Sequence, residues 1–227
     1  MSNEPDRSAV MPEADGTTSR VRPALREEAS EISALVGAAL AQFEGHVPTA
    51  WLRDYVAVSR NVEARWDKGQ VMVAEREDRI VATVTYYADA ARDNLGLPSR
   101  WAGFRTLAVD PSARGKGFGR QLVDWCVRTA RLEGARTMGI HAAPFLKVAC
   151  GLYERTGFQR CPEYDVSGAD VGFDISDGYP QVIAYRLQLS PDSTTRGEGW
   201  ERHRTFDAAA KKSHSMPQLR SLAERFS

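Results

Sequence analysis

Apolar and polar positions alternate along the chain with two different periods. Apolar side chains recur every three to four residues in four segments, and this spacing predicts helices over residues 27–43, 48–60, 120–133 and 147–156. Short apolar or alternating runs predict a strand beginning at Val21 and further strands over residues 70–76, 79–87, 101–109, 136–141 and 181–189. The acidic pair Glu77-Asp78 lies between two of these strands and predicts a hairpin.

The two ends of the chain lack this periodicity. Residues 1–19 are polar and are predicted to be a disordered leader, and residues 191–227 are predicted to be a polar tail. A short helix near residues 217–226 would fit the apolar positions of the tail, although its composition favours disorder. Residues 20–190 are then expected to form one domain.

Composition and charge exclude several classes of partner. The chain of 227 residues has 30 Lys and Arg against 30 Asp and Glu, so no overall field favours nucleic acid or an anionic membrane. Its three cysteines, Cys126, Cys150 and Cys161, are too few for a disulfide framework and favour a reducing, cytoplasmic location. We find no metal-ligand spacing, no signal peptide and no membrane-spanning run, so neither a metal nor a membrane is expected.

A glycine-rich basic turn is the most informative motif. The strand over residues 101–109 ends at Asp110-Pro111, and the turn Arg114-Gly115-Lys116-Gly117-Phe118-Gly119 leads into a helix. Free N–H groups at a helix N-terminus form a site for phosphate. Arg120 stands where a dinucleotide-binding turn needs glycine, and Gly117 stands where a P-loop needs serine or threonine. The spacing that fits is R-x-x-G-x-G.

Two motifs together identify a family resemblance. R-x-x-G-x-G, at Arg114, Gly117 and Gly119, resembles the pyrophosphate loop of the GNAT superfamily of acetyl-CoA-dependent N-acetyltransferases. About one strand further on, residues 149–158 look like the A-x-x-L-Y-x-x-x-G-F signature of the same family. The resemblance implies an α/β (α+β) fold, the GNAT fold, with a mixed central sheet of about six to seven strands flanked by helices.

The resemblance also implies a donor and its binding residues. Acetyl-CoA would be the acyl donor, with its pyrophosphate on the turn and its pantetheine arm paired with the preceding strand. The expected cofactor-binding residues are Leu107, Ala108, Val109, Arg114, Gly115, Lys116, Gly117, Phe118, Gly119 and Arg120. Tyr153 occupies the position where similar enzymes often place a general acid, and it is the expected catalytic residue.

The chain departs from the family pattern in two places. Residues 101–109 contain no Asp or Glu, so the strand carboxylate that many relatives use as a base is absent. His141, Glu44, His46 and Asp165 are alternative bases, and none of them is assigned. Leu146 stands where relatives often carry asparagine, which leaves side-chain anchoring of the pantetheine arm in question.

The expected acceptor is a primary amine of a small molecule. Acidic and aromatic residues without any Lys or Arg occur over residues 163–180, and such a segment attracts a cationic amine, although a solvated loop would look the same. A protein N-terminus or lysine is an alternative acceptor. A non-catalytic acyl-CoA-binding sensor is the alternative from another class. A homodimer is one option, since dimers are common among relatives, but the sequence does not decide the oligomeric state.

Overall fold

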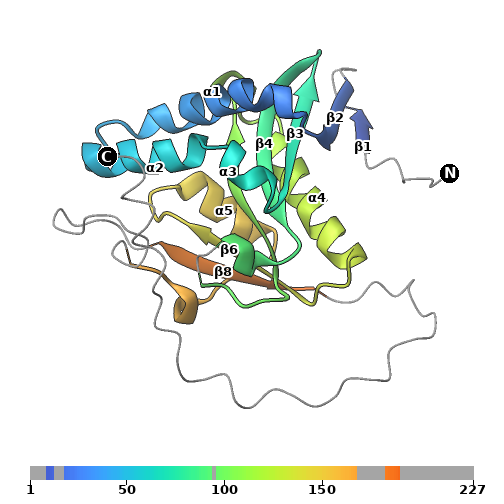
Figure 1. Ribbon diagram of the computed structural model, residues 1–227, viewed down its shortest axis with the longest axis vertical. Coiled ribbons are helices and arrows are strands. Elements are labelled where there is room, and N and C mark those ends of the chain that lie inside the picture. The colour runs from blue at the N-terminus through green and yellow to red at the C-terminus, as the bar shows by residue number, and fades with distance from the viewer. Residues whose placement is uncertain (1–8, 13–17, 94–95, 168–181, 190–227) are drawn as a thin grey trace.

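The computed structural model describes residues 9–12, 18–93, 96–167 and 182–189, and its main feature is one mixed sheet with helices on both faces (Figure 1). The strands are β1 (Ala9–Pro12), β2 (Thr18–Pro23), β3 (Gln70–Arg76), β4 (Arg79–Tyr87), β5 (Ala102–Val109), β6 (Thr137–Ala142), β7 (Gln159–Arg160) and β8 (Ile183–Gln188). The α-helices are α1 (Ala29–Leu40), α2 (Thr49–Arg60), α3 (Glu63–Trp66), α4 (Phe118–Leu132) and α5 (Lys147–Arg155). Short 3₁₀ turns are η1 (Arg26–Glu28), η2 (Ala41–Phe43), η3 (Ala90–Asp93), η4 (Pro111–Ala113) and η5 (Pro162–Tyr164).

The strand order confirms the predicted fold class. The eight strands lie in the order β1-β2-β3-β4-β5-β6-β8-β7, and all neighbours are antiparallel except β5 and β6, which are parallel. Two of the eight are very short, namely the four-residue β1 and the two-residue β7. The β5–β6 crossover contains α4, as a parallel connection requires.

The sheet starts inside the segment that was expected to be a leader. β1 and the first residues of β2 lie within residues 1–19, and Ala9 pairs with Val21. The short apolar run Ala9-Val10-Met11 is enough for one edge strand once β2 offers a partner. The expected tail over residues 191–227, with its short helix, lies outside the described residues.

The two faces of the sheet carry separate cores. Alternate residues of β3 point to opposite faces, so Met72 joins one cluster and Val71 and Val73 join the other. α4 covers the first face through the buried residues Phe118, Leu122, Val123, Trp125, Cys126, Val127 and Ala130. α1 covers the second through Ile32, Leu35, Val36 and Ala39. Figure 1 shows α2 beside α1, where it extends the second layer.

The helix ends differ from the sequence prediction in ways that matter for the site. The predicted helix over residues 27–43 is three elements, with η1 before α1 and η2 after it. α4 begins at Phe118 and not at Arg120, because Gly117 takes a left-handed conformation with φ of 87° and ends the preceding turn. The four-residue α3 was not predicted, since it is too short to show a periodic pattern.

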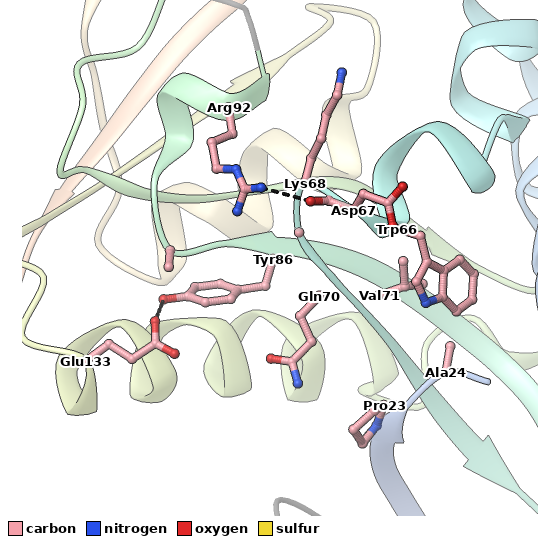
Figure 2. A pocket seen from close by; sticks show the side chains of 12 residues that line it. Pro23, Ala24, Trp66, Asp67, Lys68, Gln70, Val71, Tyr86, Arg92 and Glu133 are labelled. Atoms are coloured by element: carbon pink, nitrogen blue, oxygen red, sulfur yellow. Dashed lines mark hydrogen bonds between the residues drawn. The ribbon is translucent and has the colours of Figure 1, made fainter. Parts of the chain in front are cut away.

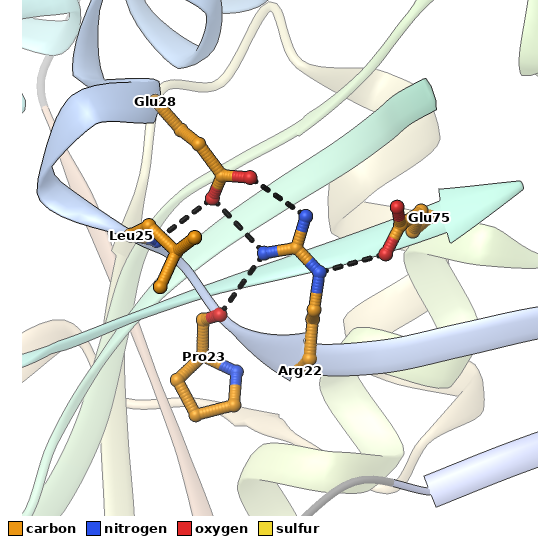
Figure 3. Close-up of polar contacts among 5 residues, drawn as sticks. All are labelled: Arg22, Pro23, Leu25, Glu28 and Glu75. Carbon is orange, nitrogen blue, oxygen red and sulfur yellow. Dashed lines mark hydrogen bonds and ion pairs between the residues drawn. The ribbon is translucent and has the colours of Figure 1, made fainter. Parts of the chain in front are cut away.

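An ion-pair network fixes the start of α1 to the sheet (Figure 3). The Arg22 guanidinium on β2 donates Nε to Glu75 at 2.7 Å, and Nη1 and Nη2 to the two oxygens of Glu28 at 2.9 and 2.7 Å. Glu28 also accepts from the backbone N–H of Leu25 at 2.7 Å. These contacts lower the pKa of Glu28 below its ordinary value of 4.5, with the Arg22 hydrogen bonds as the largest cause.

Acid should therefore weaken this network. Because the pKa of Glu28 is lower in the folded state, its stabilisation is present above pH 4.5 and is lost as the pH falls through the lowered value. We expect Glu28→Gln to lose less stability than the wild type between about pH 6 and about pH 3, by roughly 1 kcal/mol. Urea unfolding at each pH measures this difference. Glu27→Gln, at the exposed neighbour, is the control and should keep the wild-type pH dependence; equal slopes for all three proteins would contradict the assignment.

The predicted hairpin at Glu77-Asp78 is present and strained. Both turn residues have positive φ, 51° and 58°, and Arg76 pairs with Arg79 across the two-residue turn. A two-residue hairpin with both φ positive favours glycine at its second position. We expect Asp78→Gly to raise the free energy of unfolding by roughly 0.5–1 kcal/mol, measured by urea denaturation. Ala57→Gly on the exposed side of α2 should lower it by about 1 kcal/mol, which shows that glycine alone does not stabilise.

Candidate functional site

The central feature of the site is a break in the sheet between β5 and β6. Within the described residues, these strands pair only at Ala102↔Met138 and Gly103↔Gly139. Glycine is required at this point, because a Cβ on Gly103 would lie 2.7 Å from the Gly139 carbonyl and one on Gly139 would lie 2.7 Å from the Trp101 ring. Beyond the two glycines, the facing edges of β5 and β6 are left without a ladder. Buried backbone groups need partners, so this break can accept an extended ligand.

A β-bulge in β5 lies directly beyond the break. Thr83 faces Ala108 and Thr85 faces Arg105, so Thr106 and Leu107 lie opposite the single residue Val84. Thr106 takes φ of 55°, a rare value for a β-branched residue that costs on the order of 1–2 kcal/mol. The bulge turns the backbone of β5 away from a regular ladder beside the break. Sequence reasoning missed it, since the bulge depends on pairing with β4.

The glycine-rich turn connects this strand to α4. Gly115 and Gly117 have φ of 76° and 87°, and a Cβ at either position would meet no atom within 4 Å. The first bond into the helix runs from the N–H of Gln121 to the carbonyl of Gly117 at 2.9 Å. The N–H groups of residues 118–120 therefore belong to the first turn, where the backbone cannot supply acceptors. This end of α4 has the geometry of an anion site.

The basic side chains of the turn mostly point elsewhere. The Arg114 guanidinium donates to the Ala39 carbonyl at the end of α1 at 3.0 Å and to Gln42 of η2 at 3.1 Å. Arg120 donates to both oxygens of Asp124 one helical turn on, at 2.9 Å each. Lys116 is exposed. The sequence predicted three cations around the turn, and in the structure two of them are engaged with other groups.

Tyr153 lies on α5 in an aromatic cluster beside β5. Its side chain is 5 % exposed, and its ring packs against Phe104 of β5, Phe158 and Tyr185, with centroids 5.6, 6.1 and 6.2 Å away. Burial raises the pKa of Tyr153 far above its ordinary value of 10.0, so the hydroxyl stays neutral. The hydroxyl makes no hydrogen bond to the described part of the chain. It is therefore a neutral donor held by packing.

Comparison with known proteins identifies the family. The chain matches the acetyltransferase (GNAT) family over residues 40–158, more than half of its length. The chain belongs to the GNAT acetyltransferase family. The match spans the turn, α4 and the Tyr153 helix, so the resemblance first seen in two motifs is confirmed.

The individual relatives and solved structures share less than 30% of their residues with the chain. A mycothiol acetyltransferase from Cellulomonas flavigena is 28% identical over 156 residues, covering 68% of this chain and 43% of that protein. The chain thus spans less than half the length of that curated relative. The ribosomal-protein-S18-alanine N-acetyltransferase from Escherichia coli has a TM-score of 0.55 at 15% identity, over 78% of this chain and 97% of that one. The yncA protein from Salmonella typhimurium, solved with its cofactor acetyl-CoA, has a TM-score of 0.50 at 16% identity, over 77% of this chain and 98% of that one.

A second aromatic cluster joins α2 to the segment that follows β6 in this GNAT fold. Trp51 and Tyr55 of α2 stack with centroids 4.9 Å apart, and Phe145, in the segment between β6 and α5, packs edge-on to both. Phe43 of η2 packs edge-on to Phe145 at 4.7 Å. Leu146, which replaces the asparagine common in relatives, is half-buried against this cluster and offers it an apolar contact. Trp51 and Tyr55 are four residues apart, so the sequence predicts that they lie on the same face of the α2 helix. Nothing in the sequence predicts that this face packs against Phe145.

The acidic segment is largely committed to internal contacts where the structure describes it. Asp165 accepts from Nη1 and Nη2 of Arg160 at 2.9 and 2.8 Å and from the N–H of Ala184 at 2.7 Å. Glu163 pairs with Arg186 at 3.4 Å. The Arg160 hydrogen bonds lower the pKa of Asp165, which marks it as a structural carboxylate. The expected attraction of a cationic amine therefore finds no support at these two residues, and residues 168–180 lie outside the described chain.

The residues proposed as bases make contacts with nearby groups in the structure. His141 on β6 places Nε2 2.9 Å from the Tyr164 carbonyl, so this nitrogen carries a proton and holds η5 to the sheet. His46 and Glu44 are exposed in the segment before α2, with His46 Nδ1 3.1 Å from the Glu44 carbonyl. Asp165 is held by Arg160. The geometry assigns none of them as the base.

Neither a metal site nor a membrane helix is found in the part of the chain that the structure describes. No group of three or more His, Cys, Asp or Glu there is arranged to hold a metal ion. No helix there is long and apolar enough to span a bilayer. Cys126, Cys150 and Cys161 are buried and unbonded to one another, and burial raises the pKa of Cys161 to about 11.

A pocket of about 420 Å³ lies at the far end of α4 from the turn (Figure 2). Its polar contacts are the Tyr86 hydroxyl donating to Glu133 at 2.7 Å and Arg92 donating to the Asp67 carbonyl at 2.8 Å. Glu133 caps the C-terminal end of α4, about 24 Å along the helix from Gly117. The pocket contains none of the residues predicted for the site, and we do not assign it to the donor.

Proposed function

We propose that this chain is an N-acetyltransferase that moves an acetyl group from acetyl-CoA to a primary amine, most simply that of a small molecule. The observation that carries the proposal is the coincidence of three features on consecutive elements. These are the break between β5 and β6, the left-handed glycine turn at the start of α4, and the buried Tyr153 hydroxyl on α5. Together they provide an anion site, an open strand edge and a proton donor.

The donor would lie across these three features, from the glycine turn along β5 to Tyr153. Its pyrophosphate would accept hydrogen bonds from the backbone N–H groups of the turn and of residues 118–120, while Lys116 adds charge at the rim. Its pantetheine amides would pair with the free edge of β5 at Leu107, Ala108 and Val109. The bulge at Thr106 would aim a backbone N–H at the thioester oxygen, where negative charge develops.

The reaction follows from this placement. The neutral amine nitrogen attacks the thioester carbonyl carbon, the C–S bond breaks, the amine loses a proton and the thiolate gains one. The Tyr153 hydroxyl would donate a hydrogen bond to the leaving sulfur. Because burial raises the pKa of Tyr153, this donor stabilises the thiolate better than it surrenders a proton. The acceptor would enter from the α1–α2 side, across the cluster of Trp51, Tyr55 and Phe145.

Gly119 offers a test of the donor site that leaves the fold intact. A Cβ there would lie 3.5 Å from Val109 and 3.6 Å from Leu152, which is ordinary contact. The added methyl group would stand in the first turn of α4, among the N–H groups proposed to bind the pyrophosphate. We expect Gly119→Ala to keep or raise the melting temperature, since alanine favours helix by about 1 kcal/mol, and to bind acetyl-CoA at least roughly tenfold more weakly. Calorimetric titration measures the affinity.

Gly37→Ala on α1 is the matched control for this variant. It makes the same change in a helix and meets only the flexible Arg60 side chain at 3.3 Å. Its acetyl-CoA affinity should equal that of the wild type. Equal affinities for all three proteins would remove the turn from the donor site, and a wild type that fails to bind acetyl-CoA would overturn the proposed function.

Turnover tests the chemistry. Thiol release from acetyl-CoA is measured across amines, amino acids, aminoglycosides and peptides, and an amine-dependent signal is expected for a small-molecule acceptor. We expect Tyr153→Phe to keep acetyl-CoA affinity and to lower kcat roughly 10- to 100-fold. Tyr185→Phe removes a neighbouring hydroxyl, which donates to Glu154 at 3.0 Å, and should change kcat by less than about threefold. Unchanged turnover in Tyr153→Phe would exclude its role, and binding without turnover for any acceptor would favour a sensor.

A further inference from the structure

The Arg114 side chain joins the donor turn to the end of α1. Its Nη2 donates to the Ala39 carbonyl at 3.0 Å and its Nη1 to Gln42 Oε1 at 3.1 Å. Gln42 in turn donates Nε2 to the same Ala39 carbonyl at 2.8 Å. The three groups form a closed set of hydrogen bonds. Arg114 is 72 positions from Gln42 and 75 positions from Ala39 in the sequence, so the set joins two distant segments.

The end of α1 is a suitable partner for this guanidinium. Ala39 lies in the last turn of the helix, whose carbonyls have no intrahelical donor and carry the negative end of the helix dipole. A cation there is favourable, and a planar guanidinium can serve the carbonyl and the Gln42 amide at once. Lysine, with a single ammonium group, could not reproduce both contacts in the same geometry.

The η2 turn, which contains Gln42, also contributes to the aromatic cluster. Gln42 and Phe43 are adjacent in η2, and the Phe43 ring packs on Phe145 with centroids 4.7 Å apart. Phe145 contacts Trp51 at 5.1 Å. The contacts therefore run from Arg114 through Gln42 and its neighbour Phe43 to the cluster of Trp51, Tyr55 and Phe145.

We propose that Arg114 is a positioning residue that couples the donor turn to the aromatic cluster on the acceptor side. Arg114 is three residues from Gly117, so any movement of the turn when a phosphate binds also moves the group that holds the end of α1. Donor occupancy thereby sets the position of Phe43 and of the cluster behind it. This inference rests on the proposed function, because it needs a phosphate-bearing donor on the turn.

Variants of Gln42 test the coupling without changing the turn. Gln42→Ala removes the side chain that links Arg114 to η2. Gln42→Glu loses the donation to the Ala39 carbonyl but keeps the oxygen that accepts from Arg114, now as a charge-assisted contact. The readout is the indole N–H signal of Trp51 in a ¹H–¹⁵N spectrum, assigned with Trp51→Phe. Acetyl-CoA is the probe, and its affinity for each protein is measured by calorimetry in parallel.

We expect saturating acetyl-CoA to shift the Trp51 signal in the wild type and in Gln42→Glu, and to shift it at least about threefold less in Gln42→Ala. Affinity for acetyl-CoA should change by less than about twofold in both variants, because Gln42 is outside the donor site. An equal shift in Gln42→Ala would overturn the coupling while leaving the proposed function in place, and so would a wild-type signal that does not respond although acetyl-CoA binds. Failure of the wild type to bind acetyl-CoA would overturn both.

Discussion

The arrangement of this protein depends on the point where two parallel strands stop pairing. β6 pairs with β8 over six residues, and β5 pairs with β4. Because both strands are held on their outer sides, neither can rotate to pair with the other after Gly103 and Gly139. The backbone groups beyond that point need a partner. In the proposed function, a donor that presents amides in an extended chain would satisfy them, and the turn and α5 follow the same two strands. The site is a consequence of sheet geometry before it is a set of side chains.

Local features of the site could be predicted from the sequence, and features that depend on partners could not. The glycine turn, α4 and the Tyr153 helix follow from short-range periodicity and turn chemistry, and the structure has them within two residues of the expected bounds. The bulge at Thr106 requires β4 as a reference strand, and the cluster of Trp51 and Phe145 requires two distant segments to meet. Neither pattern leaves a signal in one stretch of sequence.

Charge illustrates the same limit. A count of basic residues places Arg114 and Arg120 around the anion site, yet the first guanidinium lies on the end of α1 and the second pairs with Asp124. Likewise Asp165, expected to attract an amine, is bound by Arg160. Sequence gives the number of charges but not their partners. In the proposed site, the attraction of the turn for an anion would therefore come chiefly from backbone N–H groups, which is a reason why the glycines define the motif better than the cations do.

The burial of Tyr153 narrows what the hydroxyl can do. The ordinary pKa of tyrosine, 10.0, is near enough to that of a thiol for the two groups to share a proton. Burial raises the pKa of Tyr153 and makes proton transfer to the leaving sulfur more costly. Hydrogen bonding to a thiolate is strengthened by the same low dielectric. In the proposed reaction, a buried, neutral phenol would therefore stabilise the charge as the C–S bond breaks, and the proton lost by the amine would reach the sulfur later. The aromatic cage of Phe104, Phe158 and Tyr185 thus favours electrostatic stabilisation over full acid catalysis.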